Sequence, residues 1–202
     1  MVKKVMLAVP TYENIAPQTF KSIYDLYKDD MVVDFEFVTG YDCARARNDI
    51  VDVFLRSTRK YDYLFMVDSD IILPKDALVN LMQIEDFSVN LGVYPRKDDP
   101  ETTEIFKLGK YPEFPLKDRY DISEIKDSKV TRMEIKGGGF GCALIKRDIF
   151  YNVRYPWFRY KIYSDHCILS EDLYFCDQVR MNEGKIMCDT RVLCQHIGKK
   201  IY

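Results

Sequence analysis

Asp68 and Asp70 are the residues whose spacing most clearly suggests chemistry, because carboxylates two positions apart repel each other. A hard divalent cation such as Mg²⁺ or Mn²⁺ would relieve that repulsion, and it would share its oxygen ligands with substrate phosphates. A solvated acidic turn is the alternative, since this spacing arises by chance in a chain with 32 Asp and Glu residues. The apolar runs at residues 61–67 and 71–74, on either side of the pair, support the metal-site hypothesis.

Three later residues are candidates for related chemistry. His196 follows a predicted strand, and its neutral imidazole suits Mn²⁺, although a structural histidine is the alternative. Glu171 and Asp172 open a predicted helix, where acidic residues routinely compensate the helix dipole. Such a carboxylate could instead act as a general base that takes a proton from an attacking hydroxyl.

Two further motifs have both a structural and a functional interpretation. The glycines at 137–139 form either a bulged turn or a place where a ligand approaches the backbone. Their spacing matches neither a dinucleotide-binding loop nor a Walker phosphate loop. Trp157 and Phe158 are either core residues or an aromatic platform for a sugar ring.

The elements that would position these residues alternate between strand and helix. Apolar runs predict strands at 5–9, 32–38 and 61–67, and helical periodicity predicts helices that begin near 17, 44 and 74. This alternation predicts an α/β fold with a mainly parallel sheet. In such sheets ligands bind beyond the carboxyl ends of the strands, where Pro10, Thr11 and Tyr12 follow the first strand and Asp68 follows the third.

The second half of the chain begins with a segment of little periodicity. Residues 95–129 are rich in proline and charge, so they form either an irregular surface excursion or a mobile flap over a cleft. We then expect a strand at 133–145 that glycines interrupt, a helix from Ser170 that Gly184 caps, and a last strand at 186–194. Since no linker or repeat is evident, we predict one domain over residues 1–202.

Composition limits the partners and the location. The 30 basic and 32 acidic side chains give a formal net charge of −2, which argues against a protein that mainly binds nucleic acid. No apolar run approaches the roughly 20 residues of a transmembrane segment, and residues 5–9 are too short for a signal peptide. The six cysteines include no Cys-x-x-Cys pair, and with only two histidines a zinc site is not expected. We therefore predict a cytoplasmic protein.

The order of these features along one chain resembles the GT-A glycosyltransferases, above all the family 2-type enzymes and their small bacterial and viral relatives. The resemblance runs from Val5 to about Gly198. It is most specific at the Ala-Arg-Asn segment 46–48, at the Asp-Ser-Asp segment 68–70, at residues 170–176, and at the His-Ile-Gly segment 196–198. It implies a GT-A fold, with a central, mainly parallel sheet between helices and a small antiparallel portion.

The resemblance also implies roles for individual residues. Those that would bind the nucleotide-sugar donor are Pro10, Thr11, Tyr12, Arg47, Asn48, Asp68, Ser69, Asp70, Gly138 and Gly139. Asp68, Asp70 and His196 would hold Mn²⁺ or Mg²⁺. Trp157, Phe158 and Glu171 would lie on the acceptor side. Asp172 matches the general base of inverting members, with Glu171 as its catalytic neighbour.

The resemblance thus predicts a metal-dependent, inverting hexosyltransferase. It would move a sugar from a nucleotide diphosphate donor, with a UDP-sugar favoured, to a hydroxyl of a glycan, lipid-linked or protein acceptor. The chain would act alone, as part of a larger protein or as an oligomer. The alternatives are a phosphohydrolase, a non-catalytic nucleotide- or glycan-binding module, and a sugar nucleotidyltransferase, although residues 10–13 lack the early glycine-rich loop of that last class.

Overall fold

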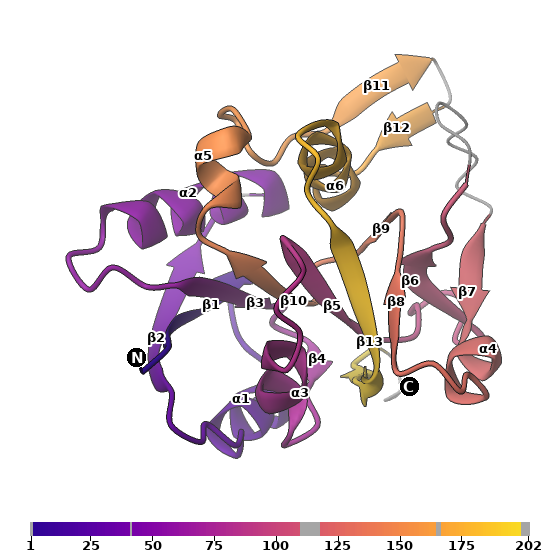
Figure 1. Cartoon of the computed structure of the whole chain (residues 1–202), viewed down its shortest axis with the longest axis horizontal. Coiled ribbons are helices and arrows are strands. Elements are labelled where there is room, and N and C mark those ends of the chain that lie inside the picture. The colour runs from indigo at the N-terminus through magenta and orange to yellow at the C-terminus, as the bar shows by residue number, and fades with distance from the viewer. Residues whose placement is uncertain (1, 41, 110–117, 165–166, 199–202) are drawn as a thin grey trace.

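A seven-stranded sheet with helices on both faces forms the centre of the computed structural model, which describes residues 2–40, 42–109, 118–164 and 167–198 (Figure 1). In chain order the elements are β1 (Lys4–Thr11), α1 (Pro17–Tyr24), β2 (Val32–Thr39), α2 (Cys43–Arg56), β3 (Tyr63–Val67), β4 (Ile71–Ile72), α3 (Ala77–Met82), β5 (Val89–Val93), β6 (Thr102–Phe106), β7 (Arg119–Asp121), α4 (Ile122–Lys126), β8 (Arg132–Glu134), β9 (Gly137–Gly138), β10 (Cys142–Lys146), α5 (Ile149–Asn152), β11 (Lys161–Ser164), β12 (Cys167–Leu169), α6 (Glu171–Met181), β13 (Ile186–Leu193) and β14 (Gln195–His196).

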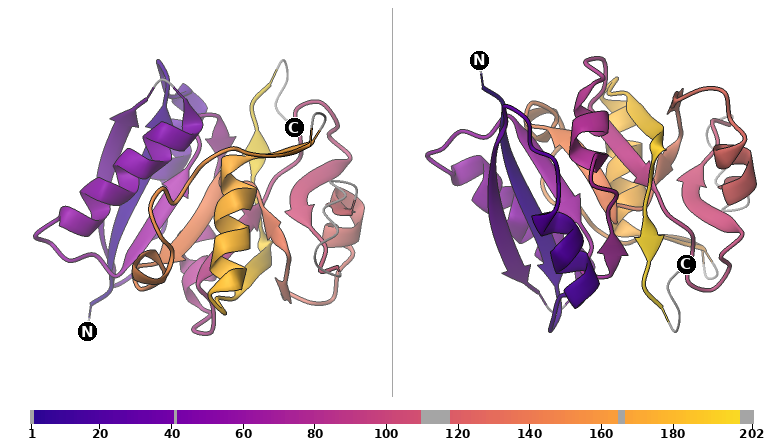
Figure 2. Two further views of the ribbon diagram at one scale, coloured as in Figure 1. Left: turned by 90° about the horizontal axis from the view of Figure 1, so that it is seen from above. Right: turned by 90° about the horizontal axis from the view of Figure 1, so that it is seen from below.

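The large sheet has the strand order β2-β1-β3-β10-β5-β13-β8. Strands β10 and β8 run antiparallel to their neighbours, while β2, β1, β3, β5 and β13 share one direction, which confirms the mainly parallel sheet. Helices α2, α5 and α6 cover one face and α1 and α3 the other, and Figure 2 shows α2 and α6 lying across the same face. Within the described residues, no helix has the length and apolar character that crossing a membrane requires.

The residues of β3 show why this strand lies in the middle of the protein. Its side chains alternate between two apolar layers, with Leu64 and Met66 packed beneath α2 and α6 and Phe65 packed towards α1 and α3. All three are fully buried, and a continuous apolar run is what a strand covered on both faces requires. Both layers therefore fix the carboxyl end of β3, where Asp68 follows.

A second, three-stranded sheet provides the antiparallel portion, in the order β7-β6-β9. The irregular excursion expected at 95–129 is therefore wrong for much of the described part of that segment, which forms β6, β7 and α4. Strand β6 pairs with the glycine stretch through Ile105–Gly138, and Ile105 is fully buried. Residues 110–117 of the predicted excursion lie outside the described residues.

Two strands differ from the sequence analysis. It does not predict β5, because Asn90 and Gly92 interrupt the apolar run, yet Asn90 is buried and its amide donates a hydrogen bond to the carbonyl of Leu81 at 2.9 Å. The single strand expected at 133–145 is three short strands, β8, β9 and β10. The glycines take the chain out of the large sheet, into the small one at β9, and back again.

The end of α6 lies where the sequence predicts a cap at Gly184. The N–H groups of Gly184 and Glu183 donate to the carbonyls of Val179 and Arg180 at 2.9 and 3.1 Å, a Schellman-type cap. Glu183, with φ of 60°, occupies the left-handed position of this cap, and Gly184 follows it. Gly184 is needed for another reason, since a Cβ there would lie 2.7 Å from Cγ1 of Val179.

We predict that Glu183→Gly raises the free energy of unfolding by about 0.5–1 kcal/mol, because glycine adopts the left-handed conformation without steric cost. Gly184→Ala should lower it by about 1–3 kcal/mol, the cost of overpacking. Urea denaturation of both variants measures these changes. A stabilising Gly184→Ala would show that this description of the cap is wrong.

Candidate functional site

The carboxyl ends of β1, β2 and β3 surround a cavity of about 350 Å³, called here the first cavity. It is lined by Pro10, Thr11, Tyr12, Gly40, Asp42, Cys43, Ala46, Asp68, Ser69 and Asp70. Gly40 lets the end of β2 approach α2, because a Cβ there would lie 2.7 Å from Cβ of Ala46. Tyr12 lines this cavity and is 65% exposed, so its ring is available for stacking.

A second cavity, of about 440 Å³, adjoins the first and shares Asp68 with it. Its lining comes from the ends of the two larger sheets, from the two-stranded pairs β11–β12 and β4–β14, and from the start of α6: Asp68, Tyr94, Glu104, Phe106, Arg119, Gly139, Ile168, Ser170, Asp172, Leu173 and His196. Asp68 thus forms part of the wall between a space at the strand ends and a space beside Asp172.

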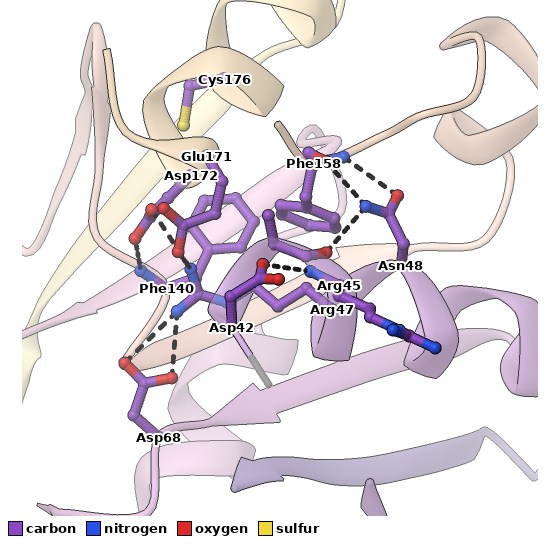
Figure 3. A network of polar contacts seen from close by, with 12 residues as sticks. Asp42, Arg45, Arg47, Asn48, Asp68, Phe140, Phe158, Glu171, Asp172 and Cys176 are labelled. Atoms are coloured by element: carbon purple, nitrogen blue, oxygen red, sulfur yellow. Dashed lines mark hydrogen bonds and ion pairs between the residues drawn. The ribbon is translucent and has the colours of Figure 1, made fainter. Parts of the chain in front are cut away.

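Behind this wall the buried side chain of Arg47 meets three carboxylates, of which Glu171 is buried and Asp68 and Asp172 are partly exposed (Figure 3). This group is called here the buried cluster. Arg47, on α2, donates from Nη1 to Oε1 of Glu171 at 2.5 Å and from Nη2 to Oδ1 of Asp68 at 3.0 Å. Its Nη1 also lies 3.2 Å from Oδ1 of Asp172. The side chain of Arg47 is only 3% exposed, so these ion pairs replace its hydration.

The pKa shifts in this cluster follow from burial and charge. Burial alone would lower the pKa of Arg47, but the three carboxylates raise it well above its ordinary value. Burial outweighs Arg47 at Asp68 and raises the pKa of that carboxyl. Burial, with Asp172 beside it, raises the pKa of Glu171 to about 7 although Arg47 acts in the opposite direction.

Asp172 faces the second cavity while protein donors hold both of its oxygens. The backbone N–H of Phe140 donates to Oδ2 at 3.0 Å, and Arg47 lies against Oδ1. Each carboxylate oxygen has a further lone pair, so Asp172 can still accept a proton from a hydroxyl in the cavity. The carboxylate is therefore both oriented and accessible, with a side chain 14% exposed.

His196 reaches Asp70 because β14 pairs with β4, directly after Asp70. Its Nδ1 lies 2.8 Å from the carbonyl oxygen of Pro95, so Nδ1 carries a proton. Its Nε2 lies 3.5 Å from Oδ1 of Asp70. Burial would raise the pKa of Asp70, but His196, when its ring is protonated, and Lys97 outweigh burial and lower it.

This arrangement fits a divalent cation. In the neutral ring, the lone pair of Nε2 faces the carboxylate oxygen of Asp70, and the two repel each other. A cation between them would bind both and remove that repulsion. Among the described residues, no three His, Cys, Asp or Glu side chains converge as a complete ligand set. Mg²⁺ and Mn²⁺ commonly take their other ligands from water and substrate phosphates, so two protein ligands suffice.

The structure brings some predicted donor-binding residues together and separates others. Pro10, Thr11, Tyr12, Ser69 and Asp70 line the first cavity, as the shared end of β1 and β3 requires. Gly139 lines the second cavity.

Gly138 instead faces the core, since a Cβ there would lie 2.8 Å from Cδ1 of Leu91. Arg47 and Asn48 are buried and line neither cavity, and their contact with the donor stays a prediction. Asn48 binds the backbone after α5. Its amide nitrogen donates to the carbonyl of Phe158 at 2.7 Å, and its amide oxygen accepts from the N–H of Phe158 at 3.2 Å.

The predicted acceptor-side residues also need correction. Phe158 is 1% exposed and its ring packs between Phe140 and Phe175, so it is a core residue. Trp157 packs edge-on against Phe150 and lines neither cavity. Glu171 is 5% exposed and turned towards Arg47, away from both cavities.

The sequence analysis misses several lining residues. Tyr94 and Glu104 follow or form strands that it does not predict, and Arg119 lies on β7. Gly40 and Asp42 are lining residues that the sequence could have predicted, because β2 ends beside β1 in the predicted parallel sheet.

Comparison with known proteins yields likeness in structure but not in sequence. No protein-family model matches the chain, and no curated protein matches it. It superposes on A197 from STIV with a TM-score of 0.67 and 18% identity, over 96% of this chain and 86% of that one. For GalNAc-T7, solved with UDP, GalNAc and Mn²⁺, the TM-score is 0.62 and the identity 10%, over 98% and 44%.

The catalytic domain of Drosophila β1,4-galactosyltransferase 7, solved with xylobiose, gives a TM-score of 0.56 and 17% identity, over 98% of this chain and 71% of that one. These likenesses confirm the fold expected from the sequence. The chain has a GT-A fold.

We predict that Arg47→Met lowers the free energy of unfolding by about 3–5 kcal/mol near pH 8, since it leaves buried carboxylates unpaired. The loss should be smaller near pH 5. Without the guanidinium, burial raises the pKa of these carboxylates in the folded state, so stability is retained at low pH and lost as the pH rises through the raised pKa.

Urea denaturation at both pH values measures this effect. Arg45→Met, on the exposed side of the same helix, is the control, with an expected change of at most about 0.5 kcal/mol. Equal losses in the two variants would contradict the role given to the buried cluster.

Proposed function

We propose that this chain is a metal-dependent glycosyltransferase that moves a sugar from a nucleotide diphosphate donor to an acceptor hydroxyl. The observation that carries the proposal is the pair of adjoining cavities that share Asp68. A nucleotide in the first cavity would direct its diphosphate towards Asp70 and its sugar into the second cavity, beside Asp172. The GT-A fold of the chain agrees with this assignment.

A uridine nucleotide is the favoured donor. GalNAc-T7 was solved with UDP, TarS from S. aureus with UDP-GlcNAc, and the Drosophila galactosyltransferase with manganese and UDP-Gal. In this chain the exposed ring of Tyr12 would stack on the base, and Thr11 would border the same part of the cavity. Glycan, lipid-linked and protein acceptors all offer the hydroxyl that the reaction needs.

Asp70 and His196 would hold the divalent cation, with Asp68 as the nearby carboxylate already paired with Arg47. When bound, such a cation neutralises charge on the departing nucleoside diphosphate. Pro95 contributes by fixing the ring of His196 through its carbonyl group.

Asp172 would take the proton of the acceptor hydroxyl, and such a base typically contributes 10²–10⁴-fold to the rate. Arg47 and the N–H of Phe140 orient its carboxylate, which makes Arg47 a positioning residue. Glu171 would act through Arg47 in the same way, because it contacts the guanidinium and not the cavity. Attack by the activated hydroxyl from the side opposite to the leaving diphosphate would invert the anomeric centre.

The first test is release of nucleoside diphosphate from a panel of nucleotide sugars, with and without Mn²⁺. We expect one donor to react with water slowly, and EDTA or Asp70→Ala to abolish the reaction. Asp86→Ala removes an exposed aspartate far from the cavities and is the matched control. Nucleotide binding without turnover would favour a binding module, and absence of both binding and turnover would refute the proposal.

The second test concerns the base. Asp172→Asn should lower nucleoside diphosphate release at least about 10²-fold, because the amide cannot accept the proton. Its affinity for UDP, measured by calorimetry, should stay within about twofold of the unmodified protein, since Asp172 lines the other cavity. Full activity in this variant would remove Asp172 from the mechanism.

A further inference from the structure

Lys97 contacts the carboxylate on which the proposed metal site depends. Its Nζ forms an ion pair with Oδ2 of Asp70, while His196 faces Oδ1 of the same carboxylate at 3.5 Å. Pro95, two residues earlier, accepts the hydrogen bond of His196 at 2.8 Å. The short segment after β5 therefore touches both residues of the proposed cation site.

The charges around the two cavities indicate what a lysine beside Asp70 contributes to diphosphate binding. In the part of the chain that the structure describes, the cavity linings and the buried cluster hold six carboxylates, against four cationic side chains. The carboxylates are Asp42, Asp68, Asp70, Glu104, Glu171 and Asp172, and the cations are Arg47, Lys97, Arg119 and Arg96, the last paired with Glu104. This excess of negative charge would repel a diphosphate, so additional positive charge has to reach it.

We propose that Lys97 is a built-in counter-ion of Asp70 that a divalent cation displaces, and that the freed ammonium group then binds the diphosphate of the donor. This inference rests on the proposed function and adds a specific phosphate ligand to it. The side chain is 45% exposed, so it has room to move between the two partners. A lysine is a flexible point charge with three donors, which suits a phosphate as well as a carboxylate.

The first half of the proposal is tested with Mn²⁺ alone, without nucleotide. Lys97→Met removes the competing cation, so it should bind Mn²⁺ about two- to fivefold more tightly in calorimetry, the factor expected for loss of a partly exposed ion pair. Lys185→Met is the matched control, because Lys185 forms a similar exposed pair with Asp86. Its Mn²⁺ affinity should equal that of the unmodified protein.

The second half is tested with inorganic pyrophosphate at saturating Mn²⁺. Lys97→Met should bind it about tenfold more weakly, as expected for loss of a charge-assisted contact, and Lys97→Arg should restore most of the affinity. The control Lys185→Met should again be unchanged.

Each result bears directly on Lys97. Unchanged or weaker Mn²⁺ binding in Lys97→Met, or no Mn²⁺ binding by any of the proteins, would overturn the displacement. Unchanged pyrophosphate binding would overturn the phosphate contact. Both expected shifts without turnover of any nucleotide sugar would leave the role of Lys97 intact and count against the glycosyltransferase alone.

Discussion

The buried guanidinium of Arg47 connects the three elements that border the proposed site. Arg47 extends from α2 and pairs with the carboxylate that ends β3 and with two carboxylates that begin α6 (Figure 3). Removing an arginine from water is costly, and only the combined attraction of several carboxylates offsets that cost. The cluster therefore fixes how far the start of α6 lies from the end of β3, and with it the shape of both cavities.

The charged residues divide into those that build the site and those that face it. Arg47 and Glu171 are buried and line neither cavity, whereas Asp70 lines the first cavity. Asp68 and Asp172 do both, since they pair with Arg47 and also line a cavity. Proximity in sequence hides this division, since Glu171 and Asp172 are adjacent yet face different surroundings. The helical turn between neighbours sends one side chain inwards and the other towards the cavity.

Much of the architecture follows from apolar patterning alone. The runs that became β1, β3 and β13 are buried, and their polar ends mark the edge where the cavities lie. Patterning fails where burial is not apolar: β5 contains Asn90, whose buried amide group donates a hydrogen bond to a backbone carbonyl. It also fails for residues whose role depends on distant partners, since burial of Phe158 or pairing of Lys97 with Asp70 reflects tertiary contacts.

The small antiparallel pair between β4 and β14 has a consequence for folding. Partners in the site are far apart in sequence, with 124 residues separating Arg47 from Glu171 and 101 separating Pro95 from His196. Because non-local contacts close slowly, we expect the site to form late, after the large sheet has brought β13 beside β5. The β4–β14 pair consists of two residue pairs, as does the β6–β9 pair beside the second cavity, so we expect local opening to begin at these short junctions without unfolding of the core.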